Sequence, residues 1–207
     1  NEYYYMGVML SAANTLNWVR DNFFPHSNWD EIEERINKSV PGANGIIFLP
    51  YLNGERTPHR DPNARGVIFG LSSINTENDV LRATMEGITF GLRDSFELIK
   101  QKTEINDMRI VGGGAKNKTW IRLVAANFKM PIKIPQIDEG GAYGASMLAA
   151  LGNGQKLEQV LSWVKIKEII EPEPQLFEIY DELYEIYKNL YFSLKENFIE
   201  VARFLNL

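Results

Sequence analysis

A run of three glycines, Gly112 to Gly114, constrains the fold of this chain more than any other feature of its sequence. The mostly apolar residues 108–111 before the run predict a strand, and the apolar spacing after it predicts a helix. The same order returns over residues 131–151, where a short strand, a second glycine loop and a helix of small residues follow one another. Strand, glycine loop and helix, used twice, indicate an α/β protein.

Apolar periodicity also predicts the elements outside these two units. We expect helices over residues 9–23, around Ile32 and Ile36, and over 80–102, and strands over 2–6, 46–49 and 67–71. Thr76 and Asp79 have the spacing of a capping box that begins the third helix. A terminal helix should dock through a stripe of Leu176, Tyr180, Leu183, Tyr187, Leu190, Leu194, Phe198 and Val201.

A second row of residues on the helix predicted for 80–102 is unusually small. Ala83, Gly87 and Gly91 recur every four residues, although each glycine costs a helix roughly 1 kcal/mol. We therefore expect another backbone segment to approach this face of the helix closely.

The composition excludes several classes of protein. The chain has no cysteine and two histidines, His26 and His59, so a disulfide framework, a thiolate metal site and a histidine-rich zinc site are not expected. Its formal net charge of -5 argues against nucleic acid as a partner. Apolar runs are far shorter than the roughly 20 residues of a membrane span, and no signal peptide is evident, so we expect a cytoplasmic protein without a membrane partner.

The loop between residues 112 and 118 is suited to a phosphate or a nucleotide. Glycines let a ligand touch the backbone, and the following helix offers unpaired N–H groups at its start. The loop resembles both the P-loop and the dinucleotide fingerprint, but Asn117 stands where each motif requires glycine. A tight strand-to-helix turn without a ligand is the alternative reading of this loop.

A polar stretch, residues 51–66, could bind a hydroxylated or phosphorylated ligand, or could be a solvated connection. His59 in this stretch is assigned no catalytic role. No spacing pairs the acidic residues with a nucleophile or with one another, so we expect surface or structural roles for Glu55, Asp61, Glu86, Asp94, Asp138 and Glu139.

Several segments, read together and in order, resemble one family. These are residues 6–14 followed by Trp18, the run 48–59 (FLPYLNGERTPH), 64–71 (ARGVIFGL), 82–87 (RATMEG), the glycine loop at 112–115 with Trp120, and 139–145 (EGGAYGA). Together they are similar to the xylulose kinase branch of the FGGY carbohydrate kinases, up to about residue 155.

The resemblance implies a lobe of the ribonuclease H-like or actin–hexokinase ATPase type, with a mixed sheet flanked by helices and a C-terminal helical tail. It implies ATP and Mg²⁺ as cofactors, with the nucleotide held mainly by this second lobe. By resemblance, the nucleotide would be contacted by Gly113, Gly114, Ala115, Asn117 and Lys118, and flanked by Ala13 and Asn17.

The family's catalytic aspartate and the opening strands of this lobe would lie upstream, and Asn1 is not an initiator methionine, so we expect a truncated chain that is inactive alone. We expect residues 1–170 to form the kinase lobe and 171–207 a helix docked on it. The expected partners are a sugar, most simply D-xylulose, MgATP and the missing N-terminal lobe, and a homodimer stays open. Gluconate, ribulose or glycerol as the substrate and a non-enzymatic nucleotide- or sugar-sensing module are the alternatives.

Overall fold

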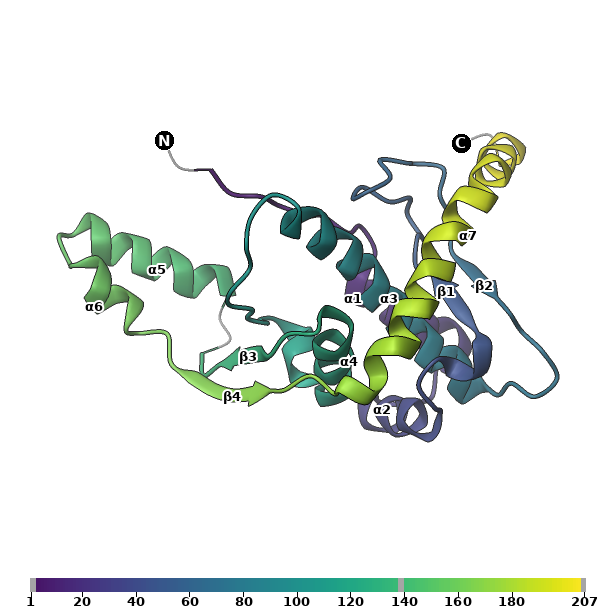
Figure 1. Ribbon diagram of the computed structural model, residues 1–207, viewed down its shortest axis with the longest axis horizontal. Coiled ribbons are helices and arrows are strands. Elements are labelled where there is room, and N and C mark those ends of the chain that lie inside the picture. Colours follow the sequence, from purple (N-terminus) through teal and green to yellow (C-terminus); the bar gives the residue numbers. More distant parts are fainter. Residues whose placement is uncertain (1–2, 138–139, 206–207) are drawn as a thin grey trace. The chain divides into compact units, whose positions relative to one another are not determined.

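A computed structural model describes residues 3–137 and 140–205 of the chain (Figure 1). The chain folds as two compact units. Unit 1 comprises Asn1–Glu104 together with Pro174–Leu207, and unit 2 comprises Ile105–Glu173.

Unit 1 is organised around one long helix and a two-stranded antiparallel sheet, in which Phe48 is paired with Ile68. Its elements are α1 (Ala12–Phe23), α2 (Trp29–Lys38), η1 (Ala43–Gly45), β1 (Ile47–Leu49), β2 (Val67–Phe69), α3 (Glu77–Lys100), η3 (Pro174–Leu176) and α7 (Phe177–Phe204). The core lies where α1, α2 and β1 pack against α3. All three residues of β1 are buried.

The sequence of α3 explains both its start and its packing. The backbone N–H of Thr76 donates to the Asp79 carboxylate at 2.7 Å, which confirms the predicted capping box. A Cβ at Gly87 would meet the carbonyl oxygen of Phe48 in β1, and one at Gly91 would meet the Met9 side chain. The expected close approach to this face is thus confirmed, with β1 as the approaching backbone at Gly87.

The terminal helix α7 lies against β1 and α3 (Figure 1). The predicted stripe is partly right, because Tyr180, Tyr187, Leu190 and Phe198 are buried. It is wrong at Val201, which is 45% exposed, and it left out the buried residues Tyr184, Tyr191 and Ala202.

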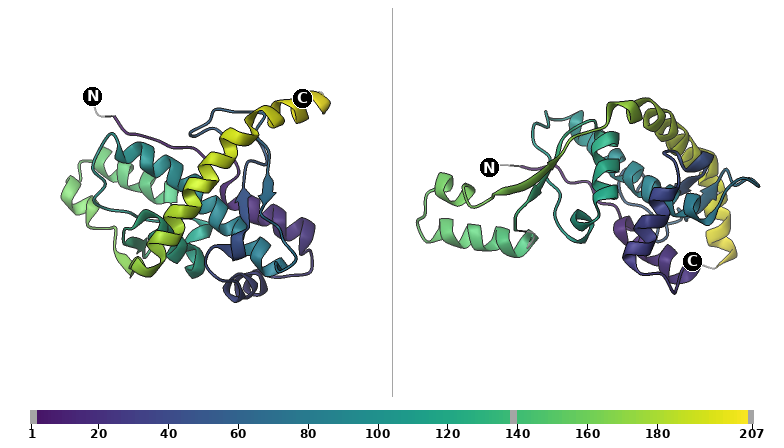
Figure 2. Two further views of the ribbon diagram at one scale, coloured as in Figure 1. Left: turned by 45° about the vertical axis from the view of Figure 1, so that its right-hand side comes forward. Right: turned by 90° about the horizontal axis from the view of Figure 1, so that it is seen from below.

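Unit 2 contains both glycine loops. Its elements are η2 (Gly113–Lys116), α4 (Lys118–Phe128), β3 (Ile132–Pro135), α5 (Gly140–Gly152), α6 (Leu157–Leu161) and β4 (Ile166–Ile170). Strands β3 and β4 pair antiparallel, and α4 packs on both. Figure 2 shows α5 and α6 beside each other, beyond one end of the β3–β4 ribbon.

Two expectations for the strands need correction, and one strand was not predicted. Residues 108–111 form an isolated parallel bridge between Arg109 and Lys133 rather than a full strand, so the mixed character of the sheet in unit 2 comes from that single bridge. Residues 3–6 are not in a strand, and the remainder of the strand expected there lies outside the described residues. Strand β4 was not predicted; it pairs with β3, as Ile132 opposite Ile170 shows.

Candidate functional site

The loop after residue 111 is a tight turn that leaves space beside two of its glycines. Gly112 has φ 90° and ψ −173°, a backbone conformation that L side chains rarely adopt. A Cβ built on Gly112 or Gly113 would meet no atom within 4 Å. The chain then closes into η2, where the N–H of Ala115 donates to the Gly112 carbonyl at 2.9 Å. A ligand could therefore approach the backbone at Gly113 directly.

Gly114 is a glycine for a different reason. A Cβ at this position would collide with the six-membered ring of Trp120. Trp120 lies in the first turn of α4, so the absence of a side chain at Gly114 lets the loop pack on its own helix. Of the predicted glycine contacts, Gly113 has the open approach, whereas Gly114 has an internal packing role.

Asn117 and Lys118 stand at the start of α4, and both already have partners in unit 2. The Asn117 side-chain oxygen accepts the backbone N–H of Trp120 at 2.7 Å and so caps the helix. The Lys118 ammonium lies 3.0 Å from the Glu168 carboxylate of β4, with 61% of its side chain exposed. An exposed ion pair of this kind contributes little, about 0 to 1 kcal/mol, so Lys118 can exchange Glu168 for a phosphate at small cost.

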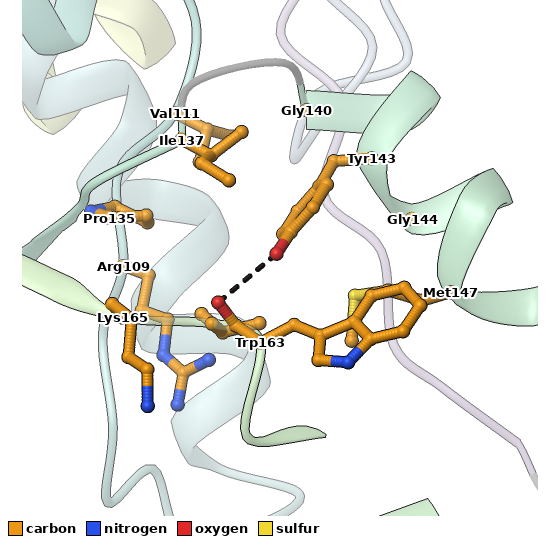
Figure 3. A pocket seen from close by; sticks show the side chains of 11 residues that line it. Arg109, Val111, Pro135, Ile137, Gly140, Tyr143, Gly144, Met147, Trp163 and Lys165 are labelled. Carbon is orange, nitrogen blue, oxygen red and sulfur yellow. Dashed lines mark hydrogen bonds between the residues drawn. The ribbon is translucent and has the colours of Figure 1, made fainter. Parts of the chain in front are cut away.

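A cavity of about 200 Å³ lies in unit 2, between Val111 and the start of α5 (Figure 3). Val111, which precedes the first loop, and Gly140 at the start of α5 both line it. The Tyr143 hydroxyl donates to the carbonyl oxygen of Trp163 at 3.1 Å across one side of the cavity. The other lining residues are Arg109, Pro135, Ile137, Gly144, Met147, Val164 and Lys165. Sequence reasoning missed this cavity, because its walls come from four separate segments.

The two remaining predicted contacts lie in unit 1. Ala13 and Asn17 are one turn apart on α1, where Ala13 is exposed and Asn17 is half-buried. They therefore share one accessible face of that helix. The glycine loop, in contrast, lies in unit 2.

The acidic residues weighed as general bases have structural partners. Glu86 is buried and accepts the N–H of Gly42, the guanidinium of Arg82 at 2.8 Å and the hydroxyl of Tyr180 at 3.0 Å. Asp61 accepts from Tyr191 at 2.9 Å. Glu86 and Asp61 therefore each have partners within unit 1.

Two further members of that acidic set, Glu55 and Asp94, are also buried. Asp94 accepts the Tyr184 hydroxyl at 2.7 Å. Asp138 and Glu139 lie outside the described residues, and with them the loop expected there. Burial lowers the pKa of His59 to about 4, so its ring is neutral at pH 7.

Neither a metal cluster nor a membrane-spanning helix is found in the part of the chain that the structure describes. Within residues 3–137 and 140–205, no group of three or more His, Cys, Asp or Glu side chains is arranged to hold a metal ion. Within the same part of the chain, no helix is long and apolar enough to cross a membrane.

Comparison with known proteins identifies the family. Residues 1–152 match the FGGY family of carbohydrate kinases, C-terminal domain. A xylulose kinase of Staphylococcus epidermidis is 40% identical over 184 residues, which cover 87% of this chain and 37% of that protein. The chain thus spans well under half the length of this relative.

Solved structures agree with the sequence match. The ligand-bound xylulose kinase of Lactobacillus acidophilus superposes with a TM-score of 0.86 at 28% identity, over 93% of this chain and 40% of the other. The gluconate kinase of Lactobacillus acidophilus gives 0.85 at 28% identity, over the same shares. The fold is therefore that of one lobe of an actin–hexokinase-type sugar kinase. The chain belongs to the FGGY family of carbohydrate kinases, whose C-terminal domain it matches.

Proposed function

We propose that this chain is the nucleotide-binding part of an ATP-dependent sugar kinase that transfers the γ-phosphate of ATP to a hydroxyl of D-xylulose, giving xylulose 5-phosphate. The observation that carries the proposal is the 40% identity to a xylulose kinase over 87% of the chain. The whole enzyme would have two lobes, of which residues 1–170 supply the second and residues 171–207 a helix docked on it.

Within this proposal the nucleotide lies against the loop that begins at Gly112. Gly113 supports this placement, since its side-chain position is open. The start of α4 adds the positive end of a helix dipole, which favours an anionic ligand. Lys118 can turn from Glu168 to a phosphate, and Asn117 keeps its amide nitrogen as a donor while its oxygen caps α4. Ala115 continues the same turn, and Ala13 and Asn17 are proposed to flank the nucleotide from α1.

The chemistry of phosphoryl transfer defines what such a chain contributes. The reaction depends chiefly on positioning and on stabilising charge, and a bound Mg²⁺ would supply part of that charge. The described residues offer no ready-made metal cluster, so no step is assigned to a metal held by this chain. The base that takes the proton from the sugar hydroxyl is expected upstream. The role left to these residues is to bind and orient the nucleotide.

Calorimetric titration of the chain with MgADP tests the nucleotide site. We expect binding in the wild type and a loss of at least about tenfold in Gly113→Val, because the new side chain fills the space left for the ligand. Gly152→Val is the matched control, since Gly152 also faces open space but ends α5. Failure of the wild type to bind at millimolar nucleotide, weaker than about −4 kcal/mol, would count against the site.

A second measurement addresses the sugar and needs the complete two-lobed enzyme. ADP release should depend on D-xylulose and should be much slower with gluconate, ribulose or glycerol. Preference for one of those three would overturn D-xylulose as the proposed substrate but would support the proposed kinase activity. A protein that binds nucleotide but turns over none of the four would be a sensing module instead.

A further inference from the structure

The loop of residues 51–65, between β1 and β2, is fastened to the terminal helix α7. The Tyr51 hydroxyl donates to that of Tyr187 at 2.8 Å, and both side chains are fully buried. The Tyr191 hydroxyl donates to Asp61 at 2.9 Å, and its ring stacks on His59 with centroids 3.4 Å apart. Two tyrosines, one helical turn apart, thus hold the start and the middle of the loop.

The loop holds its own shape through a short backbone bridge. The N–H of Glu55 donates to the Asp61 carbonyl at 2.9 Å, and the N–H of Asp61 donates back to Glu55 at 2.8 Å. Gly54, with φ 75°, makes the turn before the bridge, and a Cβ there would meet the Asp61 carbonyl oxygen at 2.8 Å. Because Asp61 also accepts the Tyr191 hydroxyl, it links α7 to Glu55.

On its far side the loop holds the segment that leads into α1. The Glu55 carboxylate accepts the N–H of Leu10 at 3.1 Å. Thr57 exchanges two hydrogen bonds with Val8, each of 3.0 Å, one through its side chain and one through its backbone. Asn53 donates to the Ser11 hydroxyl at 3.2 Å. Four hydrogen bonds thus tie the loop to residues 8–11, directly before α1 begins at Ala12.

Burying the carboxylate of Glu55 in this loop costs free energy of folding. Its side chain is 2% exposed, and its Oε2 has no hydrogen-bond partner among the described residues. Burial raises the pKa of this carboxyl, opposed by the hydrogen bonds from Arg56 and Leu10. A buried carboxylate that serves two backbone N–H groups makes sense where the position of those groups matters.

We propose that Tyr187 and Tyr191 are positioning residues that act through the loop of residues 51–65 to hold the start of α1. Because Ala13 and Asn17 lie in the first two turns of α1, the same contacts set the face that would flank the nucleotide. This second part rests on the proposed function. The path of contacts runs from α7 to the loop, then from Glu55 of the loop to Leu10, and from Leu10 into α1.

Tyr191→Phe tests the path, because it removes the bond to Asp61 while it keeps the stacked ring. Tyr184→Phe is the matched control: it lies on the same helix, is also buried, and loses one hydroxyl bond, but to Asp94 on α3. We expect amide hydrogen exchange at Asp61, Glu55, Val8 and Leu10 to rise roughly 2- to 10-fold in Tyr191→Phe and to stay unchanged in Tyr184→Phe.

Glu55 gives an independent pair of variants. Glu55→Ala should speed exchange at Leu10, and Glu55→Gln, which keeps an acceptor oxygen, should restore protection. Equal exchange in Tyr191→Phe and Tyr184→Phe, or no difference between Glu55→Ala and Glu55→Gln at Leu10, would overturn the proposal.

MgADP affinity separates this inference from the proposed function. If the wild type binds, Tyr191→Phe should weaken binding about threefold to tenfold and Tyr184→Phe should not. Unchanged affinity in Tyr191→Phe would overturn the link to the nucleotide. If the wild type does not bind, the proposed function fails, and the exchange measurement alone decides whether α7 positions α1.

Discussion

Asp94 shows how strongly one buried carboxyl can couple this fold to pH. It lies on α3, is 6% exposed, and accepts the Tyr184 hydroxyl. Burial raises its pKa to about 7 from an ordinary value of 3.8, against the opposing effects of Tyr184 and Lys188. Between these two pH values the folded chain binds more protons at this site than the unfolded chain. The contribution of Asp94 to stability therefore falls as pH rises through that window.

Asp94→Asn removes this titration and so tests whether the contribution of Asp94 to stability falls as pH rises. From pH 5 to pH 7, the wild type should lose about 1 to 2 kcal/mol of unfolding free energy relative to the variant, measured by urea denaturation. His59 acts in the opposite direction, because its lowered pKa makes stability rise with pH between about 4 and 6.5, but it is common to both proteins. A difference between the two proteins that does not change with pH would contradict the assignment.

Single residues also show where sequence reasoning reaches its limit. Gly112 to Gly114 and the helix start at Asn117 were predictable, because a turn and a cap are local patterns. The ion pair of Lys118 with Glu168 joins residues 50 positions apart, and no local pattern signals it. The separate reasons for glycine at 113 and at 114 also depend on the position of the Trp120 ring, which only the folded loop shows.

Among the elements, the N-terminal cap of α3 also joins neighbouring elements to this helix. Asp79 accepts the Thr76 N–H at 2.7 Å, the Ser39 hydroxyl at 2.5 Å and the Asn44 amide at 2.9 Å. Ser39 follows α2 and Asn44 lies in η1, so one carboxylate joins three elements. The side chain of Asp79 is buried, and its loss would leave those donors unsatisfied.

Asp79→Ala should therefore cost about 2 to 4 kcal/mol of unfolding free energy, more than the roughly 1 kcal/mol of an ordinary cap. The control is Glu31→Ala, which removes the exposed half of the capping box of α2, where the side chains of Asn28 and Glu31 each bond the other's backbone. Urea denaturation of both variants measures the difference. Equal losses would mean that the contacts with Ser39 and Asn44 add nothing.

The terminal helix illustrates what periodicity can and cannot predict. Spacing by three and four located α7 and much of its buried stripe, because burial on one face imposes that period. It missed Tyr184 and Tyr191, whose hydroxyls bond to Asp94 and Asp61, partners 90 and 130 positions away. A tyrosine has an apolar ring and a polar tip, so its burial depends on a distant partner that the period does not reveal.

At the scale of the whole molecule, the two units differ in how much of their helices they bury. In unit 1, α3 buries most of its 24 residues, including Leu81, Met85 and Phe90. In unit 2, α4 buries seven residues, whereas α5 buries none. Leu148 of α5 is 70% exposed on a helix without a charged residue. A 13-residue helix with so little packing is marginal in water by itself, since isolated helices below about 12 to 15 residues are.

We therefore expect native-state hydrogen exchange of the wild-type chain to differ among these helices in the order of their burial. Amides in α3 should exchange slowest, those of α4 at an intermediate rate, and those of α5 at least about 100-fold faster than α3, through local opening that leaves unit 1 intact. The comparison of α4 with α5 is the internal control, because both belong to unit 2 and differ in burial. Protection of α5 equal to that of α3 would show that its exposed apolar face is covered in solution, so that the burial found within this chain understates what holds the helix in place.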